Sequence, residues 1–169
     1  MCFSKCILAL FLIALTCSGC THTDSSDDLN DSGIIKEDDY NMQIAIFPMG
    51  MGDWTYHIIL DGSILRCDIG VRNDNNIDQK EFLRIIRESS TVELDAVDIR
   101  MLVHLASELE ASGCNSRLED ADDTWGVLFM YNGKIYGGLT GFMKSEPFEM
   151  LIDEFIRLSP ISIDLFEFS

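Results

Sequence analysis

Two predicted strands near the start of the folded region carry the side chains best suited to polar chemistry. The ranges 54–60 and 64–71 alternate in polarity and are joined by an Asp-Gly turn, a strong hairpin signal. This hairpin would place His57, Arg66 and Asp68 on one face, with His57 opposite Arg66 and Asp68 on the diagonal. A histidine oriented by a carboxylate is one part of a catalytic set, but no nucleophile accompanies it. The simpler interpretation is a solvated sheet face with paired charges.

Metal ligands at close spacing are missing from the sequence. His57 and His104 are far apart, and neither has a neighbouring ligand at helical or hairpin spacing. The acidic run 119–123 opens with the alternate spacing of a calcium loop. However, Trp125 stands where such a loop needs glycine, and Tyr131 where it needs glutamate. We expect no metal and no cofactor, with a calcium site of another kind in 119–123 as the alternative.

Cysteine usage changes sharply along the chain. Four of the six cysteines lie within the first twenty residues, so only Cys67 and Cys114 belong to the predicted folded part. Outside the cytoplasm a disulfide between them is permitted, and closing a loop of that length would contribute about 4 kcal/mol. The alternative is two buried free thiols that behave as small apolar side chains.

A second predicted hairpin is apolar on both faces. The ranges 125–131 and 134–140 flank Asn132-Gly133, the most favourable two-residue hairpin turn. Exposed aromatic patches usually mark interaction sites. The aromatic face of this hairpin and two polar residues of the first hairpin therefore form the candidate binding face, namely Trp125, Phe129, Tyr131, Tyr136, His57 and Arg66. The alternative is that another part of the chain, such as the tail from Ile161, covers the rings.

The first nineteen residues have the pattern of an export signal. A positive start is followed by an apolar run over 7–15, far shorter than the ~20 residues that span a bilayer. The segment Cys17-Ser18-Gly19-Cys20 resembles the lipobox of bacterial lipoprotein precursors, with Cys17 where leucine is usual. The resemblance implies cleavage after Gly19, a diacylglyceryl group on Cys20, and a protein anchored at the cell membrane or outer envelope, facing outside the cytoplasm. Cleavage that releases a soluble protein is the alternative, as is an uncleaved leader.

Charge restricts the partners. The formal net charge is −17, which excludes nucleic acid as a partner and means that membrane attachment must come from the lipid anchor. Residues 20–41 are rich in Asp and Ser and predict a disordered spacer. We therefore expect a signal peptide over 1–19, a lipidated cysteine with an acidic spacer over 20–41, and a single α+β domain over 42–169.

The order of predicted elements within that domain is β-β-β-α-α-β-β-α. The two hairpins, with helices grouped between and after them, favour an antiparallel sheet of about five strands with about three helices mainly on one face. Helices are expected from Asp78 to Ser89-Ser90, from Asp95 to Gly113 and from Ser145 to Ser159, and a final edge strand over 161–165. The layout is similar to that of small uncharacterised bacterial lipoproteins, a resemblance that implies no activity.

Taken together, these features favour a lipid-anchored envelope domain that binds a protein, peptide or small ligand without catalysis. The acidic excess and the exported location suggest one alternative, an envelope hydrolase that uses paired carboxylates. A purely structural anchored module is the other.

Overall fold

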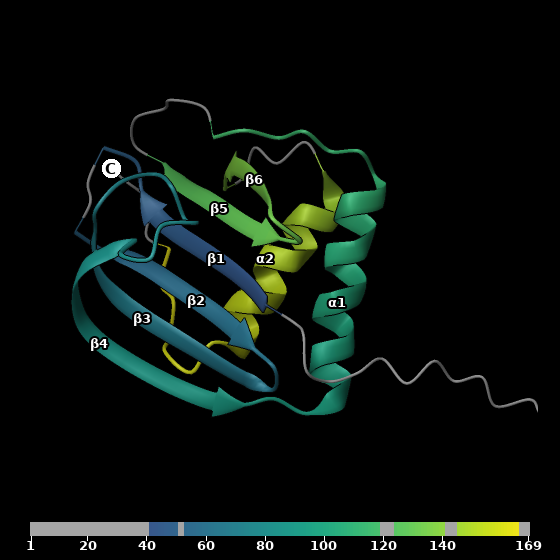
Figure 1. The fold of residues 1–169 in the computed structure, drawn as a ribbon, viewed down its shortest axis with the longest axis horizontal. Helices are drawn as coiled ribbons and strands as arrows, with labels where there is room; N and C mark the ends of the chain where they lie inside the picture. Colours follow the sequence, from purple (N-terminus) through teal and green to yellow (C-terminus); the bar gives the residue numbers. More distant parts are fainter. Residues whose placement is uncertain (1–40, 51–52, 119–123, 141–144, 166–169) are drawn as a thin grey trace, which may run out of the picture. The chain divides into compact units, whose positions relative to one another are not determined.

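The computed structural model of the chain describes residues 41–50, 53–118, 124–140 and 145–165, so Cys20 and the predicted leader and spacer lie outside the described residues. The described part is an α+β fold with one six-stranded antiparallel sheet, in the order β4-β3-β2-β1-β5-β6, and two helices (Figure 1). The elements are β1 (Asn41–Pro48), β2 (Thr55–Asp61), β3 (Ile64–Arg72), β4 (Leu83–Glu93), α1 (Ala96–Ala111), β5 (Trp125–Tyr131), β6 (Lys134–Leu139) and α2 (Glu146–Leu158).

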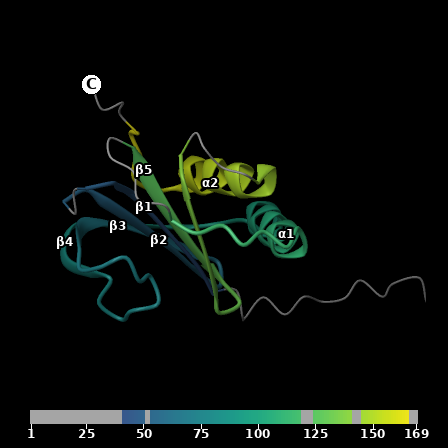
Figure 2. The same ribbon diagram turned by 90° about the horizontal axis from the view of Figure 1, so that it is seen from above.

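Both helices pack on the same face of the sheet, as Figure 2 shows from above. The main core lies between them and the sheet, because the alternating apolar residues of five strands point to this face. Its fully buried members include Ile44, Ile58, Leu65 and Phe129 from the strands and Leu102, Leu109, Leu151 and Phe155 from the helices. The expected placement of helices on one face is confirmed.

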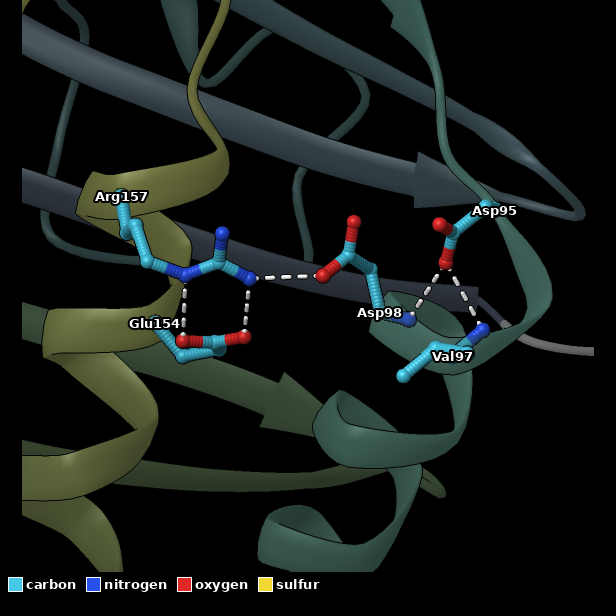
Figure 3. Close-up of polar contacts among 5 residues, drawn as sticks. All are labelled: Asp95, Val97, Asp98, Glu154 and Arg157. Atoms are coloured by element: carbon cyan, nitrogen blue, oxygen red, sulfur yellow. Dashed lines mark hydrogen bonds and ion pairs between the residues drawn. The ribbon is translucent and has the colours of Figure 1, made fainter.

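Polar contacts fix the ends of the two helices. Asp95 caps α1, since its side chain accepts hydrogen bonds from the backbone N–H groups of Val97 at 2.8 Å and Asp98 at 2.9 Å (Figure 3). Arg157 in the last turn of α2 donates to Glu154 and to Asp98, both at 2.6 Å. This guanidinium therefore ties the end of α2 to the start of α1.

Both predicted hairpins are confirmed. Asn132 and Gly133 form a two-residue turn with φ angles of 50° and 71°, so that Tyr131 pairs with Lys134. In the first hairpin the two-residue turn is Gly62-Ser63, one residue later than expected. Moving the turn by one residue shifts each cross-strand pairing by two positions, which keeps every side chain on its predicted face.

The helix predicted from Asp78 to Ser89-Ser90 is wrong, because residues 83–93 form the edge strand β4. Two irregularities interrupt its pairing with β3. Leu83 and Ile86 pair with Arg72 and Gly70, which lie two apart on β3 and so share one face. An extra residue in β4 thus spaces its apolar side chains by three, as in a helix.

The predicted edge strand over 161–165 is also absent, since these described residues form no strand. Ile161, Ile163 and Leu165 instead pack against the main core. The two outer strand positions belong to β4 and β6, so the tail contributes apolar contact without backbone pairing to the sheet.

The face of the sheet opposite the helices carries a second, smaller core. It consists of Ala45, Phe47, Met49, Ile77, Phe82 and Leu128. Two of these, Ile77 and Phe82, come from the segment 73–82, which connects β3 to β4 and lies over this face. The backbone N–H of Asn73 donates to the carbonyl of Phe82 at 2.8 Å, which closes the base of the segment. The segment 73–82 therefore covers part of the helix-free face.

Candidate functional site

A buried polar cluster lies on this helix-free face and is formed by strands β1 to β4. Strand register brings its members together: His57 of β2 pairs with Asp68 of β3, which in turn pairs with Ser89 of β4. Arg66 precedes Asp68 by two residues and shares its face. His57 therefore lies opposite Asp68, and the predicted pairing of His57 with Arg66 is wrong. The prediction that the three side chains share one face is confirmed.

The carboxylate of Asp68 is the most buried charge in the cluster, with 3% of the residue exposed. The hydroxyl of Ser89 donates to its Oδ1 at 2.6 Å, and Nε of Arg66 lies 3.1 Å from its Oδ2. A buried carboxylate is costly unless it is paired and hydrogen-bonded. Both oxygens of Asp68 meet that requirement through neighbours on its own strand and on β4.

His57 is 8% exposed, and burial lowers its pKa to about 4, with Arg66 acting in the same direction and Asp68 opposing it. The imidazole is therefore neutral at pH 7. Its Nε2 lies 3.2 Å from Oε1 of Gln43 on β1, so Nε2 is the protonated nitrogen when the amide oxygen accepts. The ring also meets Phe82 edge-on, with centroids 5.0 Å apart.

A cavity of about 240 Å³ opens beside this cluster, between the sheet and the segment 73–82. We call it the sheet cavity. Its polar lining comes from Gln43, His57, Arg66, Asp68, Asp78, Gln79 and Lys80, and its apolar lining from Ile59, Ile77, Phe82, Leu83 and Ile86. A pocket of apolar walls with a few converging polar groups is the usual form of a small-molecule site.

The segment 73–82 holds its shape through local side-chain contacts. Asp74 accepts from the backbone N–H of Asn76 at 2.6 Å, and Asn76 accepts from that of Asp78 at 3.2 Å. Such turns position the exposed residues that follow, Gln79 and Lys80, at the rim of the cavity. Asp78, expected to cap a helix, is instead part of this turn.

The cluster is not arranged for nucleophilic catalysis. The Ser89 hydroxyl donates to Asp68, and the partner of His57 is Gln43, so no hydroxyl is activated by the imidazole. Within the described residues, no group of three or more His, Cys, Asp or Glu side chains could hold a metal ion. The groups that the cavity offers are the cationic side chains of Arg66 and Lys80 and amide groups around an apolar floor.

The aromatic residues of the candidate binding face belong to the main core or pack against it. Trp125, Phe129 and Tyr136 are 3%, 0% and 4% exposed and pack among the main-core residues, while Tyr131 is half-buried against them. Phe129 lies within 6.4 Å, centroid to centroid, of both Phe148 and Phe155 of α2. The helices therefore cover the rings, which are unavailable as an exposed surface. The other two residues of the predicted face, His57 and Arg66, lie at the sheet cavity on the opposite side.

Cys67 and Cys114 are both free thiols in the structure. Cys67 is fully buried, and burial raises the pKa of its thiol to about 11, so it stays protonated and poorly nucleophilic at neutral pH. The structure therefore has no disulfide between Cys67 and Cys114. The calcium alternative falls on 119–123, outside the described residues.

Sequence reasoning missed Gln43, Ser89 and Lys80 as members of the site. Ser89 was assigned to the end of a helix, which hid its pairing with Asp68. The run Ile85–Val92, rich in β-branched residues and serine, was a usable signal for a strand.

Comparison of the chain with protein-family models, with curated proteins and with solved structures found no match. Within the described part of the chain, neither helix has the length and apolar character to cross a membrane.

The lowered pKa of His57 predicts a specific pH dependence of stability. Because the pKa of the folded state lies below the ordinary 6.5, the unfolded chain takes up the proton first as the pH falls. The contribution is complete above pH 6.5 and is lost progressively between pH 6.5 and about 4, by roughly 3 kcal/mol at most. We expect His57→Gln to reduce the loss of unfolding free energy over this range, measured by urea denaturation.

The matched control is His104→Gln on α1, because the side chain of His104 is 65% exposed. This variant should follow the wild-type pH profile. Equal pH profiles for His57→Gln and the wild type would show that His57 is not buried in its neutral form.

Proposed function

We propose that the chain is a lipid-anchored, extracytoplasmic binding protein without catalytic activity, and that its folded domain takes a small ligand in the sheet cavity. Two independent features support the two halves of this proposal. The segment Cys17-Ser18-Gly19-Cys20 supports the anchor. The sheet cavity, with a buried polar cluster and no activated nucleophile, supports binding without chemistry.

The observation that carries the binding half is the composition of the cavity rim. Arg66 engages Asp68 through Nε, and no described residue pairs with its two terminal nitrogens. Lys80 is exposed at the same rim and has no ion-pair partner among the described residues. In a chain with 29 acidic and 12 basic side chains, two cationic groups with unused donors at one cavity favour an anionic group on the ligand.

The apolar floor defines the rest of the ligand. Ile59, Phe82 and Ile86 present hydrocarbon to the cavity, which at about 240 Å³ admits only a small molecule. A short branched or ring-containing body attached to a carboxylate or phosphate fits both parts of the lining. We therefore propose a small amphipathic anion as the ligand class.

The hydrolase alternative receives less support from the same site. Asp68 and Asp78 both line the cavity, but Asp68 already accepts from Ser89 and pairs with Arg66. Asp78 is exposed on the segment 73–82. Neither carboxyl group is therefore placed as the buried proton donor that glycoside hydrolysis needs.

The anchor is tested by the mass of the amino terminus. We expect protein recovered from the membranes of a bacterial expression host to begin at Cys20 and to carry the mass of a diacylglyceryl group. Cys20→Ala should abolish this modification, whereas Cys17→Ala should leave it in place. A mature chain that begins at an unmodified thiol, or one that keeps residues 1–19, would refute the anchor.

The ligand class is tested with three probes that share one branched five-carbon skeleton. Isovalerate carries a carboxylate, isoamyl alcohol is neutral and isopentylamine is a cation. We expect only isovalerate to raise the melting temperature, because binding to the native state stabilises it by mass action. Lys80→Gln should weaken the apparent affinity by about tenfold, equal to one charged contact of ~1.4 kcal/mol.

Arg100→Gln is the matched control, since Arg100 is exposed on α1 and lies outside the lining of the cavity. It should bind isovalerate like the wild type. Stabilisation by all three probes alike, or by none, would contradict the proposed ligand class while leaving the anchor untouched.

A further inference from the structure

The sheet cavity offers carboxylates as well as cationic groups to a ligand. Its lining contains two cationic side chains, Arg66 and Lys80, and two carboxylates, Asp68 and Asp78. His57 adds no charge at pH 7, because burial lowers its pKa to about 4. The two positive and two negative charges cancel, so the lining is formally neutral in a chain whose net charge is −17.

One charge of each sign is already paired within the protein. The buried carboxylate of Asp68 lies 3.1 Å from Nε of Arg66. Lys80 and Asp78 are both exposed at the rim of the cavity, and no described residue forms an ion pair or a side-chain hydrogen bond with the charged group of either. The free charges of the site are therefore one ammonium and one carboxylate.

The backbone fixes the place of Asp78 and leaves its carboxylate free. Its N–H donates to Oδ1 of Asn76 at 3.2 Å, and the N–H of Asn76 donates to Oδ1 of Asp74 at 2.6 Å. Ile77 is 1% exposed and packs in the smaller core on the helix-free face. The buried side chain of Ile77 therefore holds the turn that presents Asp78 at the rim of the cavity.

A ligand with a carboxylate alone would leave Asp78 without a partner. Such a ligand can accept hydrogen bonds from the terminal nitrogens of Arg66 and from Lys80. Asp78 is two residues from Lys80, so an anion bound at Lys80 also meets a like charge. An ammonium next to the carboxylate of the ligand would replace this repulsion with a charge-assisted hydrogen bond to Asp78.

An α-amino acid carries the three groups that match this lining on one carbon atom. Its ammonium and its carboxylate both leave that carbon, so both can stay at the charged rim. Its side chain can then extend to the apolar floor of Ile59, Phe82 and Ile86. The cavity volume of about 240 Å³ limits this side chain to a short aliphatic one, such as that of valine.

We propose that the sheet cavity takes a small aliphatic α-amino acid in its zwitterionic form, and that Asp78 selects its ammonium group. Arg66 and Lys80 bind the carboxylate, and the apolar floor takes the side chain. The inference rests on the proposed function, because it takes the cavity to be a ligand site, and it adds an ammonium group to the carboxylate ligand proposed above.

Three probes that differ in one substituent test the assignment. Isovalerate, 2-hydroxyisovalerate and valine carry a hydrogen, a hydroxyl and an ammonium on the carbon next to the carboxylate. The last two are used as separate enantiomers, of which the tighter is compared. Isothermal titration calorimetry on the full chain in a non-ionic detergent at pH 7 gives the dissociation constants. We expect valine to bind about tenfold more tightly than isovalerate, and 2-hydroxyisovalerate at most about threefold more tightly.

Asp78→Asn separates the two kinds of ligand by sign. The variant keeps the size of the side chain and removes its charge, so valine should bind about tenfold more weakly. Isovalerate should bind as tightly as to the wild type or more tightly, because a like charge is lost. Glu81→Gln is the matched control, since Glu81 is exposed on the same segment but does not line the cavity. It should keep the wild-type preference for valine.

The outcomes distinguish this inference from the proposed function. Valine bound no more tightly than isovalerate would overturn the assignment and leave the cavity as a carboxylate site. Equal gains from the hydroxyl and the ammonium, or a preference for valine that survives Asp78→Asn, would overturn it in the same way. Binding of none of the three probes would overturn both the assignment and the proposed ligand site.

Discussion

The pairing of the buried Asp68 carboxylate is the interaction on which the helix-free face depends. A charge that is 3% exposed must be compensated within the protein, and Arg66 and Ser89 provide that compensation. Ser89 reaches Asp68 only because β4 pairs with β3 in one register. The same register sets Ile86 at the wall of the sheet cavity and brings the segment 73–82 back across the sheet. The hydrogen bond between Ser89 and Asp68 thus links the pairing of β4 with β3 to the shape of the sheet cavity.

The two faces of the sheet differ in how much apolar surface they bury. The helix side collects the aromatic rings of β5 and the apolar stripes of α1 and α2, and its burial supplies most of the hydrophobic stabilisation. The other side contains a smaller core and leaves room for polar groups. A cavity on the helix-free face leaves the packing of the main core unchanged, because the main core lies on the other face of the sheet. The polar side chains of the proposed ligand site therefore concentrate on the helix-free face.

Much of the fold could be predicted from sequence, because its signals are local. The Asn132-Gly133 turn, the Asp95 cap and the stripe of α2 each specify an element from adjacent residues. The strand β4 could not be predicted in this way. Its extra residue spaces Leu83 and Ile86 as a helix would, and only the non-local pairing with Arg72 and Gly70 determines its conformation.

The candidate site was predicted only in part, for the same physical reason. The shared face of His57, Arg66 and Asp68 follows from the alternation within one hairpin. Ser89 and Gln43 reach the cluster from β4 and β1, through pairing that is distant in sequence. The aromatic rings of β5 and β6 could not be assigned to a buried or an exposed face from the sequence, because both faces of that hairpin are apolar. Only the packing of α2 decides which face is buried.

A double-mutant cycle between Asp68 and Ser89 tests this account most directly. The unfolding free energies of Asp68→Ala, Ser89→Ala and the double variant, compared with wild type, isolate the coupling between the two side chains. A hydrogen bond from the Ser89 hydroxyl to a buried carboxylate predicts a coupling of about 1.5 kcal/mol or more. Coupling indistinguishable from zero would mean that β4 does not lie against β3 in this register, and would contradict the sheet edge and the site together.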